Sequence, residues 1–320
     1  MPPTTSQIAL ILGLTGGIGR AIAENLARRG WAIRALTRRP AGERPALPFA
    51  VDWRMGDALD ADAIRAAAEG AGLIVHGANP PGYRRWREDG LPMLAGSIAA
   101  AKASGATLLF PANVYVFSKA SPDRVDETTP RAPETRKGQV RLEMEMMLER
   151  AAKEEGVRVI ALRAGDFFGP GITSSWFAQA LAKGGRSAKV IRTLTPAGTI
   201  HAWAYAPDLA EAFARLVDRR DILPAFTLAH FSGHEDATGR QMAEAVRRVL
   251  GRRETPIKPF RWILLWLGAP FVPFLREALE MTWLWQKSLA LDNTRLLGLI
   301  GKEPHTPLDE AVKAALDTPR

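Results

Sequence analysis

A glycine-rich turn near the start of the chain has the residue types and spacing needed to bind phosphate. It follows the apolar segment 8–12 and continues into a stretch, 20–29, with helical spacing of apolar residues. Glycine permits a tight turn and close approach of the backbone to a pyrophosphate, while the helix N-terminus directs N–H groups at it. This strand–turn–helix predicts a dinucleotide site rather than a purely structural turn. The expected contacts are Gly13, Thr15, Gly16, Gly17, Ile18 and Gly19.

Two arginines stand at the end of the second predicted strand, about 20 residues beyond the glycine turn. NAD-preferring proteins usually carry an acid there that holds the ribose diol, and the segment 34–40 contains none. Arg38 and Arg39 are suited to a 2′-phosphate, with Thr37 donating a hydrogen bond. The segment therefore predicts NADP(H) rather than NAD(H), and solvated surface arginines are the alternative interpretation.

Composition excludes several kinds of chemistry. The 320-residue chain has no cysteine, so disulfides, thiolate catalysis and cysteine-bound metals are ruled out. Its net charge of +9 suits an anionic ligand, but the basic residues occur as scattered pairs, which argues against nucleic-acid binding. His230 and His234 are four residues apart without an identifiable third ligand, so no metal site is predicted.

The chain shows neither a signal-peptide pattern near Met1 nor an apolar stretch long enough to span a bilayer. We expect a cytoplasmic protein. The tryptophan-rich stretch 256–285 has the composition of an apolar substrate lid, a dimer surface or a membrane-surface helix. Core packing is the preferred interpretation, and contact with a membrane surface is not expected.

Strand and helix patterns alternate through the first half of the chain, which predicts an α/β fold with a doubly wound parallel sheet. We expect a Rossmann-type NAD(P)-binding domain over 1–170, with returning segments near 199–231, and a smaller C-terminal substrate lobe over 171–320. Segments 190–194 and 199–205 are predicted to form a hairpin. The predicted strands of the first half are 8–12, 32–36, 49–52, 73–76, 107–110 and 157–162, and 226–231 is a further predicted strand in the second half. The predicted helices are 61–69, 91–103, 141–155, 208–218 and 241–250, followed by a helical stretch over 261–285.

Several short motifs follow the glycine turn in order: Gly56-Asp57-Ala58-Leu59-Asp60, Gly77-Ala78-Asn79-Pro80, Leu162 to Pro170, and Leu299 to Pro304. Together they resemble the extended short-chain dehydrogenases/reductases, the NAD-dependent epimerase/dehydratase-like proteins, over nearly the whole chain. The resemblance implies a nicotinamide dinucleotide cofactor and a small-molecule substrate. Beyond the glycine turn and the arginines, it places at the cofactor Asp57, Ala58, Gly77, Ala78, Asn79, Pro111, Lys137, Ala164, Gly165 and Asp166.

The positions that carry catalysis in that family hold other residues in this chain. The family has a Ser or Thr four residues before the Tyr of a Val-Tyr pair, and here Pro111 precedes Tyr115. Its Tyr-x-x-x-Lys on the next helix is replaced by Lys137 and Arg141, which share one helix face. The resemblance therefore implies that the usual proton relay is absent.

Three residues remain as atypical catalytic candidates: Tyr115, Lys137 and Arg141. A literal Tyr-x-x-x-Lys does occur from Tyr115 to Lys119, but at a strand end rather than on a helix, so the two need not share a face. Tyr115 alone follows the carboxyl end of a parallel strand and is placed to reach the pocket. For Lys137, proton transfer is one hypothesis; the preferred one is contact with cofactor ribose or phosphate, with Arg141 paired to Glu145.

Three functions agree with these observations. The first is an oxidoreductase, or an epimerase using transient oxidation, that acts on a carbonyl or sugar-like substrate with an atypical proton donor. The second is a non-catalytic NADP(H)-binding sensor, which the replaced catalytic residues favour. A nucleotide-sugar-binding structural protein is the third. Family resemblance and the retained substrate lobe favour the enzyme. The resemblance is also compatible with a homodimer, which such proteins commonly form through two helices of the nucleotide domain.

Overall fold

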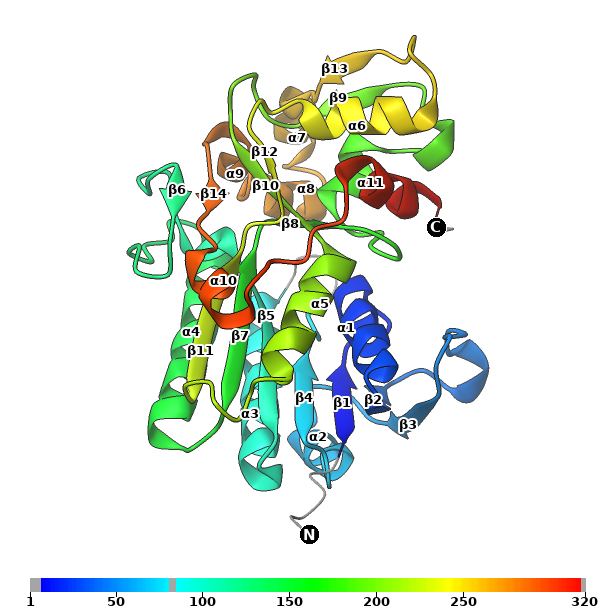
Figure 1. Cartoon of the computed structure of the whole chain (residues 1–320). Helices are drawn as coiled ribbons and strands as arrows, with labels where there is room; N and C mark the ends of the chain where they lie inside the picture. Colours follow the sequence, from blue (N-terminus) through cyan, green and yellow to red (C-terminus); the bar gives the residue numbers. More distant parts are fainter. Residues whose placement is uncertain (1–6, 81–84, 318–320) are drawn as a thin grey trace.

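The molecule is built on a seven-stranded sheet in which every neighbouring pair is parallel (Figure 1). The computed structural model describes residues 7–80 and 85–317. In spatial order the strands are β11 (Phe226–Phe231), β7 (Val159–Ala164), β5 (Thr107–Asn113), β4 (Leu73–His76), β1 (Ile8–Leu12), β2 (Ala32–Thr37) and β3 (Val51–Met55). The doubly wound parallel sheet predicted from the alternating pattern is confirmed.

Helices cover both faces of this sheet, because its central strands are apolar on both sides. On one face, Ile22 and Leu26 of α1 (Gly17–Arg28) and Phe213 of α5 (Ala206–Val217) share a core with β1. The opposite core belongs to α2 (Ala61–Ala67), α3 (Leu91–Ser104) and α4 (Arg136–Glu154).

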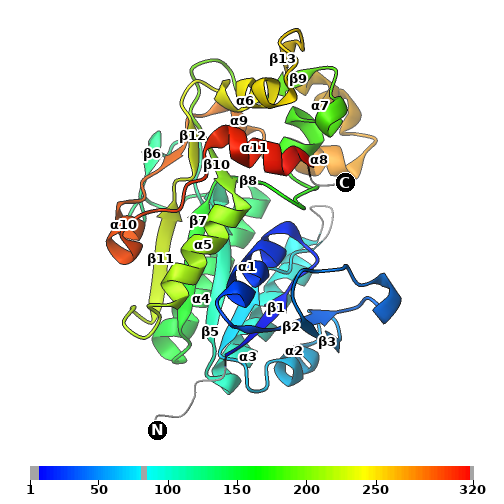
Figure 2. The same cartoon turned by 45° about the vertical axis from the view of Figure 1, so that its right-hand side comes forward.

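A smaller lobe lies beyond the carboxyl ends of the strands (Figures 1 and 2). Its core gathers large aromatic side chains, among them Phe168, Trp203 and Trp285. No helix of residues 7–80 and 85–317 is both long and apolar enough to cross a membrane. The strands of the smaller lobe are β8 (Asp166–Phe168), β9 (Ile191–Thr193), β10 (His201–Tyr205), β12 (His234–Asp236) and β13 (Ile257–Pro259). Its helices include α6 (Gln241–Leu250), α7 (Trp262–Gly268), α8 (Pro273–Leu279), α9 (Trp283–Gln286) and α11 (Leu308–Asp317).

The remaining elements connect the two lobes. The short strands β6 (Arg124–Val125) and β14 (Ala290–Leu291) pair in parallel, and α10 (Thr294–Ile300) places Leu296 in the core beside α1 and α5.

The predicted hairpin of 190–194 with 199–205 is wrong. Strand β9 pairs with β13, and β10 pairs with β8 and β12. The turn between them is held by a third segment, because Thr195 Oγ1 donates to Gly239 O and Gly198 N–H donates to Thr238 O. Each strand therefore meets a partner distant in the sequence.

Several predicted boundaries also moved. Helix α4 begins at Arg136, five residues before the predicted start, because Thr135 Oγ1 caps it by accepting from Gly138 N–H at 3.0 Å. The tryptophan-rich stretch forms three short helices rather than continuous helix; Pro270 lies between the first two, and Pro273 begins the second.

Candidate functional site

The glycine turn after β1 packs against the residues that follow β4. Gly13 has a φ of +91°, and a Cβ there would lie 2.5 Å from Gly77 O. Gly19, in the first turn of α1, lies against Gly13 O closely enough that a Cβ would collide with it. The turn therefore requires glycine on steric grounds, and it brings two predicted cofactor segments together.

The N-terminus of α1 is open to an anion. Its N-cap residue is Gly16, which has no side chain to cap the helix, and the first turn contains no acidic residue. Thr15 and Gly16 are exposed, and the first N–H groups of a helix have no partner within it. Ile172, in the loop after β8, lies directly against Gly17. This geometry fits a pyrophosphate held by the backbone.

Arg38 and Asp57 meet at the neighbouring ends of β2 and β3. Arg38 Nη1 lies 3.4 Å from Asp57 Oδ2, and the arginine side chain is 71% exposed. Thr37 is buried, and its Oγ1 accepts from Arg39 N–H at 3.1 Å. Two predicted cofactor residues thus contact one another, with Arg39 exposed beside them and Ala58 half-buried.

Tyr115 lies in a cluster with Arg141 and Asn79. It occupies a short helical turn (Val114–Val116) directly after β5, and its ring stacks on Trp86 at 6.3 Å between centroids. The Arg141 guanidinium carbon lies 4.8 Å from the Trp86 ring centroid, and Arg141 Nη2 donates to Asn79 Oδ1 at 3.2 Å. Trp86, which sequence reasoning missed, thus contacts two of the three catalytic candidates, Tyr115 and Arg141.

The two residues of the literal Tyr-x-x-x-Lys pattern, Tyr115 and Lys119, differ in solvent exposure. Tyr115 is buried, whereas Lys119 is exposed on the turn that follows. Pro111, at the position expected for a serine, lies within β5 opposite Leu162 of β7. Ala78 is half-buried next to Asn79.

Lys137 is buried and held by two carboxylates of the smaller lobe. Its Nζ donates to Glu280 Oε2 at 3.0 Å, to Glu277 Oε2, and to Glu277 O at 3.3 Å. Its backbone N–H also donates to Glu280 Oε1 at 3.0 Å. Both glutamates were missed; their spacing of three residues in Arg276-Glu277-Ala278-Leu279-Glu280 was the available signal.

The expected Arg141–Glu145 pair is wrong. Glu145 is 1% exposed and pairs with the buried Arg163, whose Nη2 lies 2.6 Å from Glu145 Oε2. Arg131 adds a second contact at 3.1 Å. Arg163 in β7 is fully buried, and a buried cation needs a counter-ion, so Glu145 faces the sheet rather than Arg141.

The segment after β7 crosses into the smaller lobe. Ala164 ends β7, and Gly165 contacts Ala202 O so closely that no Cβ fits. Asp166 Oδ2 then lies 3.0 Å from His201 Nε2, whose ring stacks on Trp285 at 4.1 Å. These three predicted cofactor residues thus lie where β7 crosses into the lobe.

His76, at the end of β4, is another residue that sequence reasoning missed. Its Nδ1 lies 2.8 Å from Ser97 Oγ, and its ring stacks on Phe110. Burial, together with the nearby Arg141 charge, lowers the pKa of His76 to about 3. The ring is therefore neutral at physiological pH and adds no charge beneath the Tyr115 cluster.

A cavity of about 530 Å³ opens in the smaller lobe. Trp176 lines it, whereas its neighbour Phe177 is buried in the core against Phe168. Helix α8 supplies part of the wall and also carries Glu277, the partner of Lys137. The other lining side chains include the apolar Phe260, Leu265, Leu275, Ala278 and Met281 and the basic Lys183, Lys189 and Arg192.

His230 and His234, four residues apart in the sequence, contact different groups. His230 Nδ1 lies 3.2 Å from Val125 O, and its Nε2 faces Arg163. His234 instead faces His305, at 4.5 Å between ring centroids. Over the described part of the chain, no group of three or more His, Cys, Asp or Glu side chains is placed to hold a metal ion.

A parallel sheet, a glycine turn after β1 and an uncapped helix behind it define a Rossmann-type dinucleotide-binding protein. The model of the NAD dependent epimerase/dehydratase family matches residues 9–226. The chain belongs to this family.

Solved structures share the architecture over almost the entire chain. A protein thought to be an epimerase, from Burkholderia cenocepacia J2315, is 22% identical with a TM-score of 0.78, covering 98% of this chain and 97% of that one. UDP-N-acetylglucosamine 4-epimerase from Bacillus cereus is 14% identical, with a TM-score of 0.73 and coverages of 96% and 93%. Thermus thermophilus UDP-glucose 4-epimerase, solved with NAD, is 20% identical, with a TM-score of 0.70 and coverages of 97% and 98%. No curated protein matches the sequence.

Proposed function

We propose that this protein is an NADP(H)-dependent oxidoreductase or epimerase-like enzyme that acts on a small carbonyl or sugar-like substrate. The observation that carries the proposal is the open N-terminus of α1 beside the glycine turn, with Arg38 at the adjacent strand end. Membership of the NAD dependent epimerase/dehydratase family and the NAD in the Thermus thermophilus structure support a nicotinamide dinucleotide. The acid-free end of β2 supports the 2′-phosphorylated form.

The positions of the chain's own residues support the following roles. The backbone after Gly13 holds the pyrophosphate, and Arg38 and Arg39 bind the 2′-phosphate through charge-assisted hydrogen bonds. A bound nicotinamide supplies the capacity to accept or donate hydride. Tyr115 is the preferred proton donor, because its phenol lies at the carboxyl end of β5. Arg141 anchors Asn79 and covers Trp86.

The cavity in the smaller lobe supports a substrate class. Trp176, Phe260 and Met281 offer apolar contact, while Lys183 and Arg192 offer positive charge. A substrate with an apolar or ring-shaped body and an anionic group complements this lining. The cavity shares helix α8 with the carboxylates that hold Lys137, which places it next to the α4 side of the site.

One observation favours the non-catalytic alternative. Lys137 stands where the resemblance places the family's catalytic tyrosine, and its Nζ is engaged by Glu277 and Glu280. A site whose central side chain is held in an ion pair can bind a dinucleotide without turning over. A protein that binds NADPH tightly but reduces no member of a broad carbonyl, imine and sugar panel would be a sensor of the NADP(H) pool.

The test is titration of the purified protein with NADPH, NADP⁺, NADH and NAD⁺, followed by quenching of its tryptophans. Arg38→Asp should weaken NADPH binding about 10- to 100-fold, the contribution of charged hydrogen bonds, and change NADH binding little. Arg65→Asp is the matched control, because Arg65 is similarly exposed and likewise paired with an aspartate, on α2. Equal losses for both dinucleotides would refute the 2′-phosphate role, and binding of none of the four would refute the enzyme proposal.

A further inference from the structure

Among the described residues, the exposed apolar side chains are concentrated in α7 and in the loop that joins it to α8. Eleven large apolar side chains are strongly exposed in the described part of the chain, and six of them lie within residues 263–272. Phe271 is 84% exposed, Leu267 65% and Trp266 60%. We call these six residues the apolar hairpin face: Ile263, Leu264, Trp266, Leu267, Phe271 and Val272.

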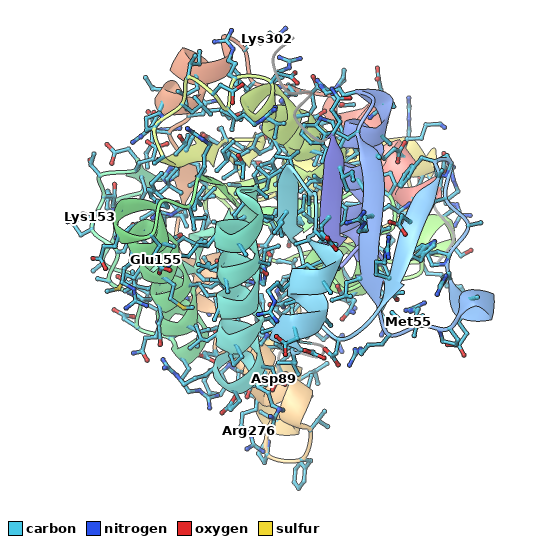
Figure 3. The ribbon with its side chains drawn as sticks, turned by 90° about the horizontal axis from the view of Figure 1, so that it is seen from below. Met55, Asp89, Lys153, Glu155, Arg276 and Lys302 are labelled. Atoms are coloured by element: carbon cyan, nitrogen blue, oxygen red, sulfur yellow. The ribbon has the colours of Figure 1, made fainter. Side chains whose placement is uncertain are left out.

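This segment projects from the smaller lobe. Figure 2 shows α7 and α8 at the edge of that lobe, and Figure 3 shows the arm that carries Arg276 extending past the rest of the outline. The hairpin is apolar on its other side as well, because Leu265 and Ala269 are buried and Leu265, Leu275 and Ala278 line the cavity. Core packing, the interpretation preferred from the sequence, is therefore right for the inner side and wrong for the outer side.

A short helix that is apolar all round needs apolar surroundings on every side. Helix α7 has the sequence Trp262-Ile263-Leu264-Leu265-Trp266-Leu267-Gly268, without a polar side chain capable of hydrogen bonding except the indoles. Contiguous exposed patches of this kind mark contact with a membrane or another macromolecule. The charges around the hairpin decide between these occupants.

Cations flank the apolar hairpin face in the sequence. Five of them are exposed within residues 252–276, where Glu254 is the one acid, and none of the five makes an ion pair with another described residue. The nearby acids Glu277 and Glu280 are instead turned to Lys137 and Arg136. The five cations are Arg252, Arg253, Lys258, Arg261 and Arg276.

An exposed apolar segment flanked in the sequence by cations without ion pairs is complementary to a lipid surface with acidic headgroups. A second copy of this chain is disfavoured, because an isologous contact would place the same cations opposite one another. The hairpin is too short to span a bilayer, so it would lie within the interface, with Trp266 near the headgroups.

We infer that the apolar hairpin face docks this protein on an anionic lipid bilayer. The six apolar side chains enter the boundary between headgroups and acyl chains, and the five cations contact acidic headgroups. The cavity, whose wall includes the inner side of the same hairpin, then faces the bilayer at its edge. Docking of this kind is independent of dinucleotide binding and does not rest on the proposed enzymatic function.

Co-sedimentation of the full-length protein with vesicles tests the inference. Vesicles of phosphatidylcholine containing phosphatidylglycerol should bind it, and vesicles of phosphatidylcholine alone should bind it much less; added salt should weaken binding. The double variant Trp266→Ser/Phe271→Ser should lose at least about tenfold in vesicle affinity. Because both side chains are exposed, the thermal midpoint should remain close to that of the parent.

Ile222→Ser is the matched control. Ile222 is 80% exposed, and its turn between α5 and β11 lies at the opposite end of the molecule from the hairpin (Figure 1). This variant should bind vesicles as the parent does. Parent protein that fails to bind anionic vesicles, or equal binding by the parent and the double variant, would overturn the inference.

The absence of cysteine offers a second measurement. Phe271→Cys, labelled with a polarity-sensitive fluorophore, should shift its emission to the blue on anionic vesicles, and the same label at Ile222→Cys should not. A blue shift at both positions or at neither would contradict insertion of the hairpin. A parent dimer in sedimentation velocity that Trp266→Ser/Phe271→Ser converts to monomer, without vesicle binding, would assign the face to a second copy instead.

Discussion

Lys137 is the residue at which sequence and structure give the most different pictures. The family resemblance places it at the cofactor, but its side chain is directed to the C-terminal end of α8, where Glu277 in the helix and Glu280 directly after it accept its hydrogen bonds. With 3% of its surface exposed, the ammonium depends on these carboxylates, because a buried charge without a partner is strongly unfavourable. Its contacts in the structure therefore join α4 to the smaller lobe.

Lys137→Met should lower the free energy of unfolding by about 3–5 kcal/mol, since it leaves two carboxylates without their cation. The double variant Lys137→Met/Glu280→Gln should recover part of that loss by removing one of the stranded charges. Urea unfolding measures both. Unchanged stability combined with lost turnover and unchanged NADPH affinity would instead assign Lys137 a role in proton transfer.

Local chemistry was predictable at single residues, and tertiary pairing was not. The tight turn at Gly13 could be predicted because it depends on the local conformation that glycine permits, and the place of Arg38 at a strand end followed from the apolar run before it. Glu145 could not, because its true partner Arg163 is distant in the sequence and fully buried. The cation nearest to a glutamate along its helix is therefore a poor predictor of its ion-pair partner when an adjacent strand carries a buried arginine.

Among the elements, the turn between β1 and α1 is the most tightly constrained. Gly13 combines a positive φ with a backbone carbonyl 2.5 Å from any added Cβ. Gly70 has a similar φ of +68° but open space around it. Substitutions at Gly13 and Gly70 therefore separate the free-energy cost of a positive φ from the cost of a steric clash with the backbone.

Gly70→Ala should cost about 1–2 kcal/mol of unfolding free energy, the penalty of the left-handed region. Gly13→Ala should cost more, and it should also abolish NADPH binding because the turn must move away from Gly77. Chemical denaturation and dinucleotide titration of the two variants check this. Similar losses of unfolding free energy at both glycines, or retained NADPH binding by Gly13→Ala, would show that the turn can move enough to accept a Cβ.

The elements of the large sheet were largely predictable, and those of the smaller lobe were not. Buried strands such as β4 and β11 have clear apolar runs and matched their predicted ranges. Strands β9 and β13 have three residues each and form only because they pair with each other across the lobe. Short strands of this kind carry too few residues for an alternating pattern to be recognised.

At the scale of the whole molecule, buried neutral histidines make the fold sensitive to acid. Burial lowers the pKa of His76 and His230 to about 3, with a further contribution from nearby arginines. Burial and the adjacent His305 lower the pKa of His234 to about 4. Between these values and 6.5, the unfolded chain binds more protons than the folded one, so stability falls as pH falls through this window.

His234→Phe should make that dependence shallower. His234 Nε2 has no hydrogen-bond partner in the described structure, and its ring already contacts Phe168, so phenylalanine suits the site. Between about pH 5 and 6, the slope of unfolding free energy against pH should decrease by up to about 1.4 kcal/mol per unit, the value for one proton. Urea unfolding across this range measures it.

Leu296→Ala is the control for this series, because it removes buried apolar volume without removing a titratable group. It should lower stability by a similar amount at every pH. A slope for His234→Phe equal to that of the parent would mean that His234 takes up its proton without unfolding.

Helix α8 contributes to the cavity wall and, through Glu277, holds the lysine at the start of α4. Any ligand that shifts α8 also changes the free energy of the Lys137 ion pair, and thermodynamic linkage makes such an effect mutual. If occupancy of the cavity tightens dinucleotide binding by some factor, the dinucleotide tightens occupancy of the cavity by the same factor. Coupling through this short helix would make the two binding events cooperative, in whichever order the ligands arrive.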